Sequence, residues 1–235
     1  MTKPQILLPD QPITAPDDDV LGYAPFSSHL ASSLKNMIPS DGFTIAIYGR
    51  WGAGKSSLLN LVENYLKDDK NIVIMRFNPW WFSGHGDLAI NFFGELQATL
   101  KLTHLTKDLL DLVGKLGDLV SIASVATGPL FPFIQMAIKA AGAVDQVRQE
   151  RENSVFELKK QIAKILKEQD KRIIVMIDDI DRLIPDEIGH LFRVIKAVAD
   201  FPKVTYILAF DRDIVTSALH ETLNVDGGEY LEKIQ

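Results

Sequence analysis

Gly49-Arg50-Trp51-Gly52-Ala53-Gly54-Lys55-Ser56 is the stretch that decides the fold, because it has the spacing G-x-x-x-x-G-K-[ST] of a phosphate-binding loop. The apolar run 43–48 precedes it, and residues 57–66 carry apolar side chains at helical spacing. Strand, glycine-rich loop and helix in this order are what such a loop requires. We therefore expect residues 49–56 to bind the phosphates of a nucleotide.

Each position of this loop meets a physical requirement of phosphate binding. Gly49, Gly52 and Gly54 allow backbone dihedrals closed to other residues and let N–H groups approach phosphate oxygens. The helix that begins near Lys55 points its positive end at the same anion. Lys55 would reach the β- and γ-phosphates, and the Ser56 hydroxyl would coordinate Mg²⁺. The alternative is a glycine-rich turn with an exposed lysine, and the strand and helix context argues against it.

Composition excludes several other classes of protein. The chain has 235 residues, 46% hydrophobic and 24% charged, which suits one large globular domain with its own core. Its net charge is -6 and no run of Lys and Arg interleaves with aromatics, so nothing indicates a nucleic-acid partner. Without cysteine, disulfides and thiolate zinc sites are impossible. The first residues do not have the pattern of a secretory signal, which favours a cytoplasmic location.

Four apolar, β-branched runs predict the strands of a parallel sheet, at 43–48, 72–77, 172–177 and 204–210. Helical stretches between them indicate an α/β fold with helices on both faces of the sheet. We expect residues 1–42 to form a lead-in and a helix that Ser27 and Ser28 cap, and residues 43–235 to form the core.

A long helical insertion is predicted at about 87–170, because residues 78–171 far exceed an ordinary crossover between strands. Residues 87–118 and 146–170 have the spacing of amphipathic helices. Residues 119–138 carry no charge, as a membrane span of about twenty residues would, but Gly128, Pro129 and Pro132 interrupt them. We expect two short helices buried in protein, with membrane contact through 119–144 as the alternative.

Acidic residues follow the third and fourth strands, at the edge where parallel sheets bind ligands. In a phosphoryl-transfer site Asp178 would hold Mg²⁺ and Asp179 would polarise the attacking water. A strand that ends in two Asp is by itself only a turn with a helix cap, so the upstream loop gives the pair its meaning. Asp211 would orient the attacking water or the γ-phosphate, or simply cap the next helix. Arg182 would neutralise phosphate charge or form an ion pair with a carboxylate.

Several motifs together resemble the KAP family of P-loop NTPases, and they span nearly the whole chain. They are Asp18-Asp19-Val20-Leu21-Gly22-Tyr23, the loop through Ser57, Phe77-Asn78-Pro79-Trp80, Asp178-Asp179-Ile180-Asp181-Arg182 and Leu208-Ala209-Phe210-Asp211-Arg212. The resemblance implies an ASCE-type sheet, with the fourth strand between the first and third, and ATP as the nucleotide. By analogy with related AAA+ and STAND enzymes, it also implies that Gly22 and Tyr23 contact adenine. Family members often carry membrane helices before the second acidic motif, and some prokaryotic members act in phage exclusion.

We therefore expect Mg²⁺-dependent ATP binding and hydrolysis to drive a conformational or assembly switch, with phage defence as its setting. The alternatives are a nucleotide-dependent scaffold or a membrane-associated signalling module, each with little turnover. The sequence stops soon after the fourth strand, so we expect a second copy or a protein partner to complete the domain. Arg182 or Arg212 of a neighbouring copy would then supply charge in trans, and the chain alone would hydrolyse ATP slowly.

Overall fold

The computed structural model describes residues 11–37, 41–84, 87–102, 106–125, 144–198 and 200–234. Four strands form one parallel sheet in the order β1-β4-β3-β2. Their bounds are β1 Phe43–Tyr48, β2 Ile72–Phe77, β3 Arg172–Ile177 and β4 Val204–Phe210. Each strand lies where the sequence predicts it, and β4 lies between β1 and β3 as an ASCE-type sheet requires. The predicted parallel α/β fold is therefore confirmed.

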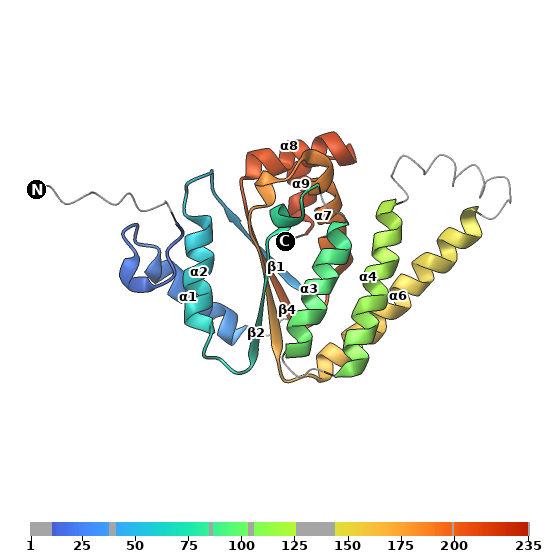
Figure 1. Cartoon of the computed structure of the whole chain (residues 1–235), viewed down its shortest axis with the longest axis horizontal. Coiled ribbons are helices and arrows are strands. Elements are labelled where there is room, and N and C mark those ends of the chain that lie inside the picture. Colours follow the sequence, from blue (N-terminus) through green and yellow to red (C-terminus); the bar gives the residue numbers. More distant parts are fainter. Residues whose placement is uncertain are drawn as a thin grey trace, which may run out of the picture.

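Helices cover both faces of this sheet, which gives the molecule three layers (Figure 1). The first face carries α1 (Ala24–Asn36) and α2 (Lys55–Leu66). The second face carries α3 (Leu88–Leu102), α7 (Pro185–Val198) and α8 (Arg212–Leu223), with α9 (Gly227–Glu232) against α8. Three single turns are η1 (Pro16–Asp18), η2 (Pro79–Phe82) and η3 (Ile180–Arg182).

The burial of the strands explains their composition. All seven residues of β4 are buried, as a strand packed on both faces and flanked by β1 and β3 must be. Side chains of β3 alternate between the two cores: Val175 faces the α3 side, and Met176 joins the cluster of α1 and α2. The strands are in register, with Tyr48 opposite Phe210 and Ile177 opposite Leu208. The segments that follow β1, β3 and β4 therefore emerge at one edge of the sheet.

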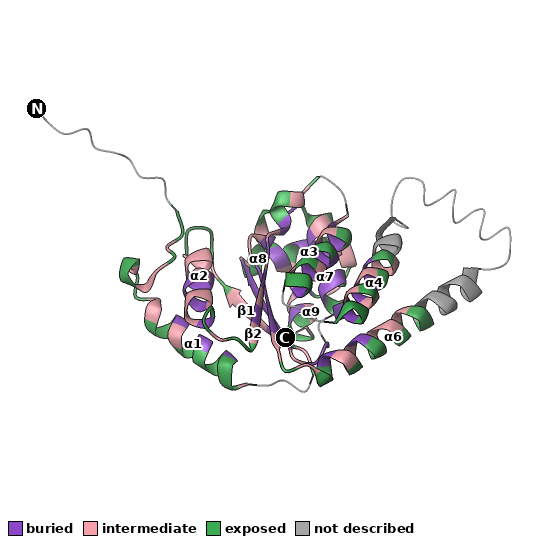
Figure 2. Cartoon of the chain, turned by 60° about the horizontal axis from the view of Figure 1, so that its bottom comes forward, coloured by how far each residue is buried: buried purple, intermediate pink, exposed green. Residues whose placement is uncertain are grey.

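The insertion begins as α3 and continues as α4 (Lys107–Val125) and α6 (Val144–Glu168), which lie outside α3 (Figure 1). Gly117 of α4 lies so close to α3 that an added Cβ would be 2.8 Å from Phe93. Figure 2 shows that α6 carries exposed and intermediate residues over much of its described length. The predicted helical stretch 87–118 is thus divided into two helices, and the Thr106 carbonyl accepts from the N–H of Leu109 where α4 begins.

The charge-free stretch lies mostly outside the described residues. The two short helices expected around Gly128 and Pro129 fall there, as does most of the segment 119–144 considered for membrane contact. Among the helices that the structure describes, none combines the length and the hydrophobicity needed to cross a bilayer.

The first helix begins earlier than the sequence predicts. It starts at Ala24, whose N–H donates to the Asp19 carboxylate at 2.7 Å, and not at Ser27. Pro25 fits the first turn because a proline there gives up no intrahelical hydrogen bond. Ser27 is buried inside the helix, and its N–H donates to the Tyr23 carbonyl at 2.9 Å. The expected serine cap is therefore wrong, because the Asp19 carboxylate accepts a hydrogen bond from the first N–H of the helix instead.

Candidate nucleotide site

A pocket of about 180 Å³ lies at the carboxyl edge of the sheet, between the loop after β1 and the turn after β3. Its walls are Gln11, Pro12, residues 51–57, Asp179, Asp181 and Arg182. Pockets that enclose a whole drug-sized ligand measure about 300–1,000 Å³. The enclosed volume here is thus suited to phosphate groups, with the rest of a nucleotide lying further out.

The loop has the backbone that a phosphate cradle needs. Gly52 and Gly54 take left-handed φ values of 79° and 78°, which favour glycine. Gly54 is also the N-cap of α2, so the unpaired N–H groups of that helix face the loop. Gly49 differs from expectation, because its φ is not left-handed. The loop is nevertheless tightly packed there, since an added Cβ would lie 3.1 Å from Ala53 Cβ and 3.3 Å from the Lys55 side chain.

Tyr23 supports this loop. Its hydroxyl donates to the Ala53 carbonyl at 2.6 Å, and its ring lies so close to Gly54 that a Cβ there would be 2.7 Å away. Neither Gly22 nor Tyr23 is among the residues that line the pocket. The adenine contact expected of them stays a prediction, and the contacts that the structure shows for Tyr23 are with Ala53 and Gly54 of the loop.

The Lys55 ammonium lies in the middle of the site and is nearly buried. It donates to the Gly49 carbonyl at 2.9 Å and to the Arg50 carbonyl at 3.4 Å. It also forms an ion pair with Asp181 at 3.3 Å, with 10% and 6% of the two side chains exposed. Asp181 belongs to the acidic motif of the sequence, but the motif alone assigned it no role. The available signal was a third acid in the cluster after β3, one turn beyond Asp178.

Ser56 and Asp178 meet as a Mg²⁺ site requires. The Ser56 hydroxyl donates to the Asp178 carboxylate, which also accepts the Asp179 N–H at 2.9 Å. Burial raises the pKa of Asp178, whereas these hydrogen bonds and the charge of Arg76 lower it. Mg²⁺ prefers oxygen ligands and is usually held by one or two carboxylates together with phosphates and water. The pair fits that ion, and the described residues contain no cluster of three or more acidic or histidine side chains suited to a metal.

Asp179 is held by two donors beside the pocket. Its Oδ1 accepts from Arg182 Nε at 2.7 Å, and its Oδ2 accepts from the Asn78 amide at 2.8 Å. The Arg182 guanidinium also lies over the Trp80 ring, 5.1 Å from its centroid. Asp179 has a left-handed φ of 58°, so the chain reverses sharply there and brings Arg182 back onto it. Arg182 therefore forms the ion pair with a carboxylate that was one of its two expected roles, and it also lines the pocket.

An extended N-terminal segment, which we call the strap (residues 11–14), lies along α2. The Ile13 N–H donates to Ser57 Oγ at 3.2 Å, and Asn60 donates to the Ile13 carbonyl at 3.0 Å. Asn64 donates to the Thr14 carbonyl at 2.8 Å. Gln11 and Pro12 of the strap reach the pocket. Polar residues on one face of α2 thus hold the strap, which forms one wall of the pocket, against the helix.

The chain matches the family described as the KAP family P-loop domain, over residues 23–234. The match includes the loop, its Ser56–Asp178 pair and all four strands. The chain belongs to the KAP family. This KAP domain is 28% identical over 242 residues to the phage T7 exclusion protein of Escherichia coli K12. The alignment covers 92% of this chain and 32% of that protein, so the chain spans about a third of its relative's length.

Solved structures similar to this KAP domain include two of the ORC2 protein of Aeropyrum pernix. The structure of its ADPNP–ADP complexes has a TM-score of 0.42 and 12% identity, covering 88% of this chain and 45% of that one. The structure of its ADP form has a TM-score of 0.41 and 11% identity, with 87% and 45% covered.

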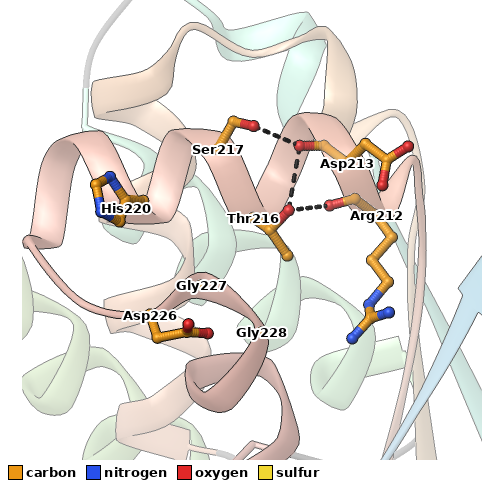
Figure 3. Close-up of a pocket in the computed structure, with 8 residues that line it drawn as sticks. All are labelled: Arg212, Asp213, Thr216, Ser217, His220, Asp226, Gly227 and Gly228. Atoms are coloured by element: carbon orange, nitrogen blue, oxygen red, sulfur yellow. Dashed lines mark hydrogen bonds between the residues drawn. The ribbon is translucent and has the colours of Figure 1, made fainter.

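Two expected residues lie away from the pocket. Asp211 caps α8 by accepting the Asp213 N–H at 3.0 Å, and it is not among the residues that line the nucleotide pocket. Arg212 extends from the start of α8 into a separate hollow between α8 and α9 (Figure 3). Its guanidinium lies 5.7 Å from the centroid of the Tyr48 ring. The hydroxyls of Thr216 and Ser217 in this hollow donate to carbonyls of their own helix (Figure 3).

Proposed function

We propose that this KAP domain binds ATP with Mg²⁺ and hydrolyses it as a switch. The observation that carries the proposal is the Ser56–Asp178 hydrogen bond beside Lys55, which combines the metal and phosphate ligands of a P-loop enzyme. Mg²⁺ held by this pair would neutralise charge on the phosphate oxygens. Lys55 would contact the β- and γ-phosphates, and the left-handed glycines would leave the loop N–H groups free for them.

The strap indicates where the nucleobase would lie in the pocket. Lys55 and the carboxylates after β3 mark the γ-phosphate end of the site. Gln11 and Pro12 form a wall contributed by another part of the chain. We propose that the base or its ribose lies against this strap, where the Gln11 amide offers both a donor and an acceptor.

Asp179 would orient the attacking water, because it lines the pocket and Asn78 and Arg182 hold its carboxylate in place. The same contacts favour a second candidate function, a scaffold that binds nucleotide with little turnover. Both oxygens of Asp179 already accept a hydrogen bond from a side chain. Phosphate release measured in single-turnover conditions separates the two candidates.

The test of nucleotide binding is a comparison of the wild type with Lys55→Ala by calorimetry, in the presence of Mg²⁺. We expect the substitution to abolish measurable ATP binding, because it removes a nearly buried cation at the centre of the site. Lys196→Ala, on α7 and away from the pocket walls, serves as the control. Equal affinities for wild type and Lys55→Ala would overturn the proposed function.

The phage T7 exclusion protein supports a setting in phage defence, with this domain as the nucleotide-dependent part of a larger system. The corresponding assay is the plating efficiency of T7-like phage on cells that express the wild type or Lys55→Ala. We expect only the wild type to reduce plating. Equal plating on both strains and on cells without the protein would contradict the proposed setting.

A further inference from the structure

All three hydrogens of the Lys55 ammonium already have acceptors within the protein. A lysine ammonium has three donors. Three acceptors lie within reach of Lys55 Nζ: the Gly49 carbonyl at 2.9 Å, the Arg50 carbonyl at 3.4 Å and the Asp181 carboxylate at 3.3 Å. A phosphate oxygen that binds Lys55 must therefore displace one of these acceptors or share a hydrogen with it. The Asp181 contact is the one that carries a full negative charge.

The backbone fixes Asp181 in this position. It lies in η3, directly after Ile180, which is fully buried in the core, and after the left-handed turn at Asp179. Only 6% of its side chain is exposed, so solvent screens its charge weakly. Asp181 also lines the pocket itself, so a bound polyphosphate would lie near it.

The charges around the pocket are unfavourable for a free nucleotide. Two cations, Lys55 and Arg182, and two carboxylates, those of Asp179 and Asp181, line the pocket, so their charges already balance. Arg182 is bound to Asp179, and Lys55 to Asp181. A polyphosphate adds further negative charge and competes with Asp181 for Lys55.

We propose that Asp181 acts as a built-in competitor of the polyphosphate for Lys55, and that it thereby makes nucleotide binding depend on Mg²⁺. This inference rests on the proposed nucleotide site. Without the metal, the polyphosphate meets the Asp181 carboxylate and a lysine that is already paired with it. With the metal beside Asp178, part of the negative charge is neutralised and the competition with Asp181 matters less. Asp181 is thus a residue that sets affinity and metal dependence, distinct from the metal ligands.

Two other roles for Asp181 predict the opposite result, because in both of them substitution of Asp181 weakens nucleotide binding. If Asp181 positions Lys55 for the phosphates, its removal weakens binding in all conditions. If it belongs to the metal shell, its removal weakens binding only with Mg²⁺. A competitor, in contrast, is the one role for which removal strengthens binding, and strengthens it most without the metal.

The experiment measures ATP and ADP affinity by calorimetry for wild type, Asp181→Asn and Asp186→Asn, each with Mg²⁺ and with EDTA. Asp186→Asn makes the same change of charge on an exposed residue in the first turn of α7, outside the pocket. We expect Asp181→Asn to bind nucleotide in EDTA about ten- to a hundredfold more tightly than the wild type, as for loss of a competing charged hydrogen bond. The gain with Mg²⁺ should be smaller, so the ratio of the two affinities falls. Asp186→Asn should match the wild type.

Thermal unfolding of each variant establishes that it is folded, and Asp181→Glu provides a second variant that keeps the charge. We expect Asp181→Glu to retain the Mg²⁺ dependence of the wild type. Weaker or unchanged nucleotide binding by folded Asp181→Asn overturns the inference, while binding that still requires Lys55 leaves the proposed function standing. Equal binding by wild type and Lys55→Ala, or no binding by any variant, overturns the proposed function and the inference together.

Discussion

Asp179 occupies a position in which its direction is fixed but its acceptor capacity is not exhausted. Arg182 and Asn78 each donate to one of its oxygens, at 2.7 and 2.8 Å. A carboxylate has about four lone-pair sites, so Asp179 can still accept from a water molecule in the pocket. Its two partners come from the turn after β3 and from the end of β2. The orientation of the proposed catalytic carboxylate therefore depends on two separate segments.

We predict that Asp179→Asn binds ATP and Mg²⁺ with nearly wild-type affinity but releases phosphate about 10²–10⁴-fold more slowly, the usual cost of losing a general base. Calorimetry measures the first quantity and a single-turnover phosphate assay the second. Asp178→Asn is the matched comparison, since it should disturb the Mg²⁺ dependence of binding instead. Wild-type turnover in both variants would mean that the acidic pair is structural.

Among single residues, motif spacing predicted which side chains lie near one another, while their roles toward a nucleotide stay predictions. Ser56 and Asp178 come together because the loop after β1 and the turn after β3 emerge at the same edge of the parallel sheet, and Lys55 precedes Ser56 in that loop. The Asp181–Lys55 pair and the Asn78–Asp179 hydrogen bond were not predicted. They depend on the left-handed φ of Asp179 and on side-chain directions after β2, which a linear pattern does not encode.

The strap and α2 form the element that connects the N-terminal segment to the nucleotide site. Ser57, Asn60 and Asn64 are spaced three and four residues apart, which places them on one face of the helix. Each makes a hydrogen bond with the strap backbone. Asn60 also accepts from Arg76, so Asn64 is the residue whose substitution affects the strap most selectively.

We predict that Asn64→Ala weakens nucleotide binding about two- to tenfold, because it removes one hydrogen bond that holds the strap near the pocket. Calorimetry with ATP measures the change. The midpoint of thermal unfolding should stay close to that of the wild type, since Asn64 contacts an exposed backbone carbonyl. Asn71→Ala, at an exposed site before β2, is the control. An unchanged nucleotide affinity in Asn64→Ala would mean that this attachment of the strap does not contribute to nucleotide binding.

Among the elements, strands were predicted more accurately than helix ends. Continuous burial in a parallel sheet leaves a plain apolar run, as in β4, so its bounds are visible in the sequence. Helix starts depend on distant partners: Asp19 determines where α1 begins, although Ser27 offered the more familiar cap. The polar face of α2 has the pattern of a solvated surface, and only the folded chain shows that the strap covers it.

On the scale of the whole molecule, the two arginines that could complete the site differ in position: Arg182 lies in the nucleotide pocket, whereas Arg212 lies outside it. Arg182 is bound to Asp179 and stacked on Trp80 within its own site. Arg212 lies at a separate hollow, outside the walls of the nucleotide pocket. Trp51 lines that pocket with 80% of its surface exposed, and Trp81, next to Trp80, is 74% exposed. We propose that a second copy of the chain covers this aromatic side of the site and brings its Arg212 to the bound nucleotide.

We predict that ATP turnover per site rises with protein concentration, because arginine supplied in trans can contribute about 10³–10⁵ in rate. Mixing Lys55→Ala with Arg212→Ala subunits should restore turnover, since the first retains Arg212 and the second retains an intact nucleotide pocket. Mixing Lys55→Ala with Arg182→Ala should not, because Arg182 is needed beside Asp179 in its own chain. Phosphate release and solution mass, measured on the same samples, relate the rate to assembly. Fast turnover that is independent of concentration would show a self-sufficient site and contradict the need for a neighbouring copy.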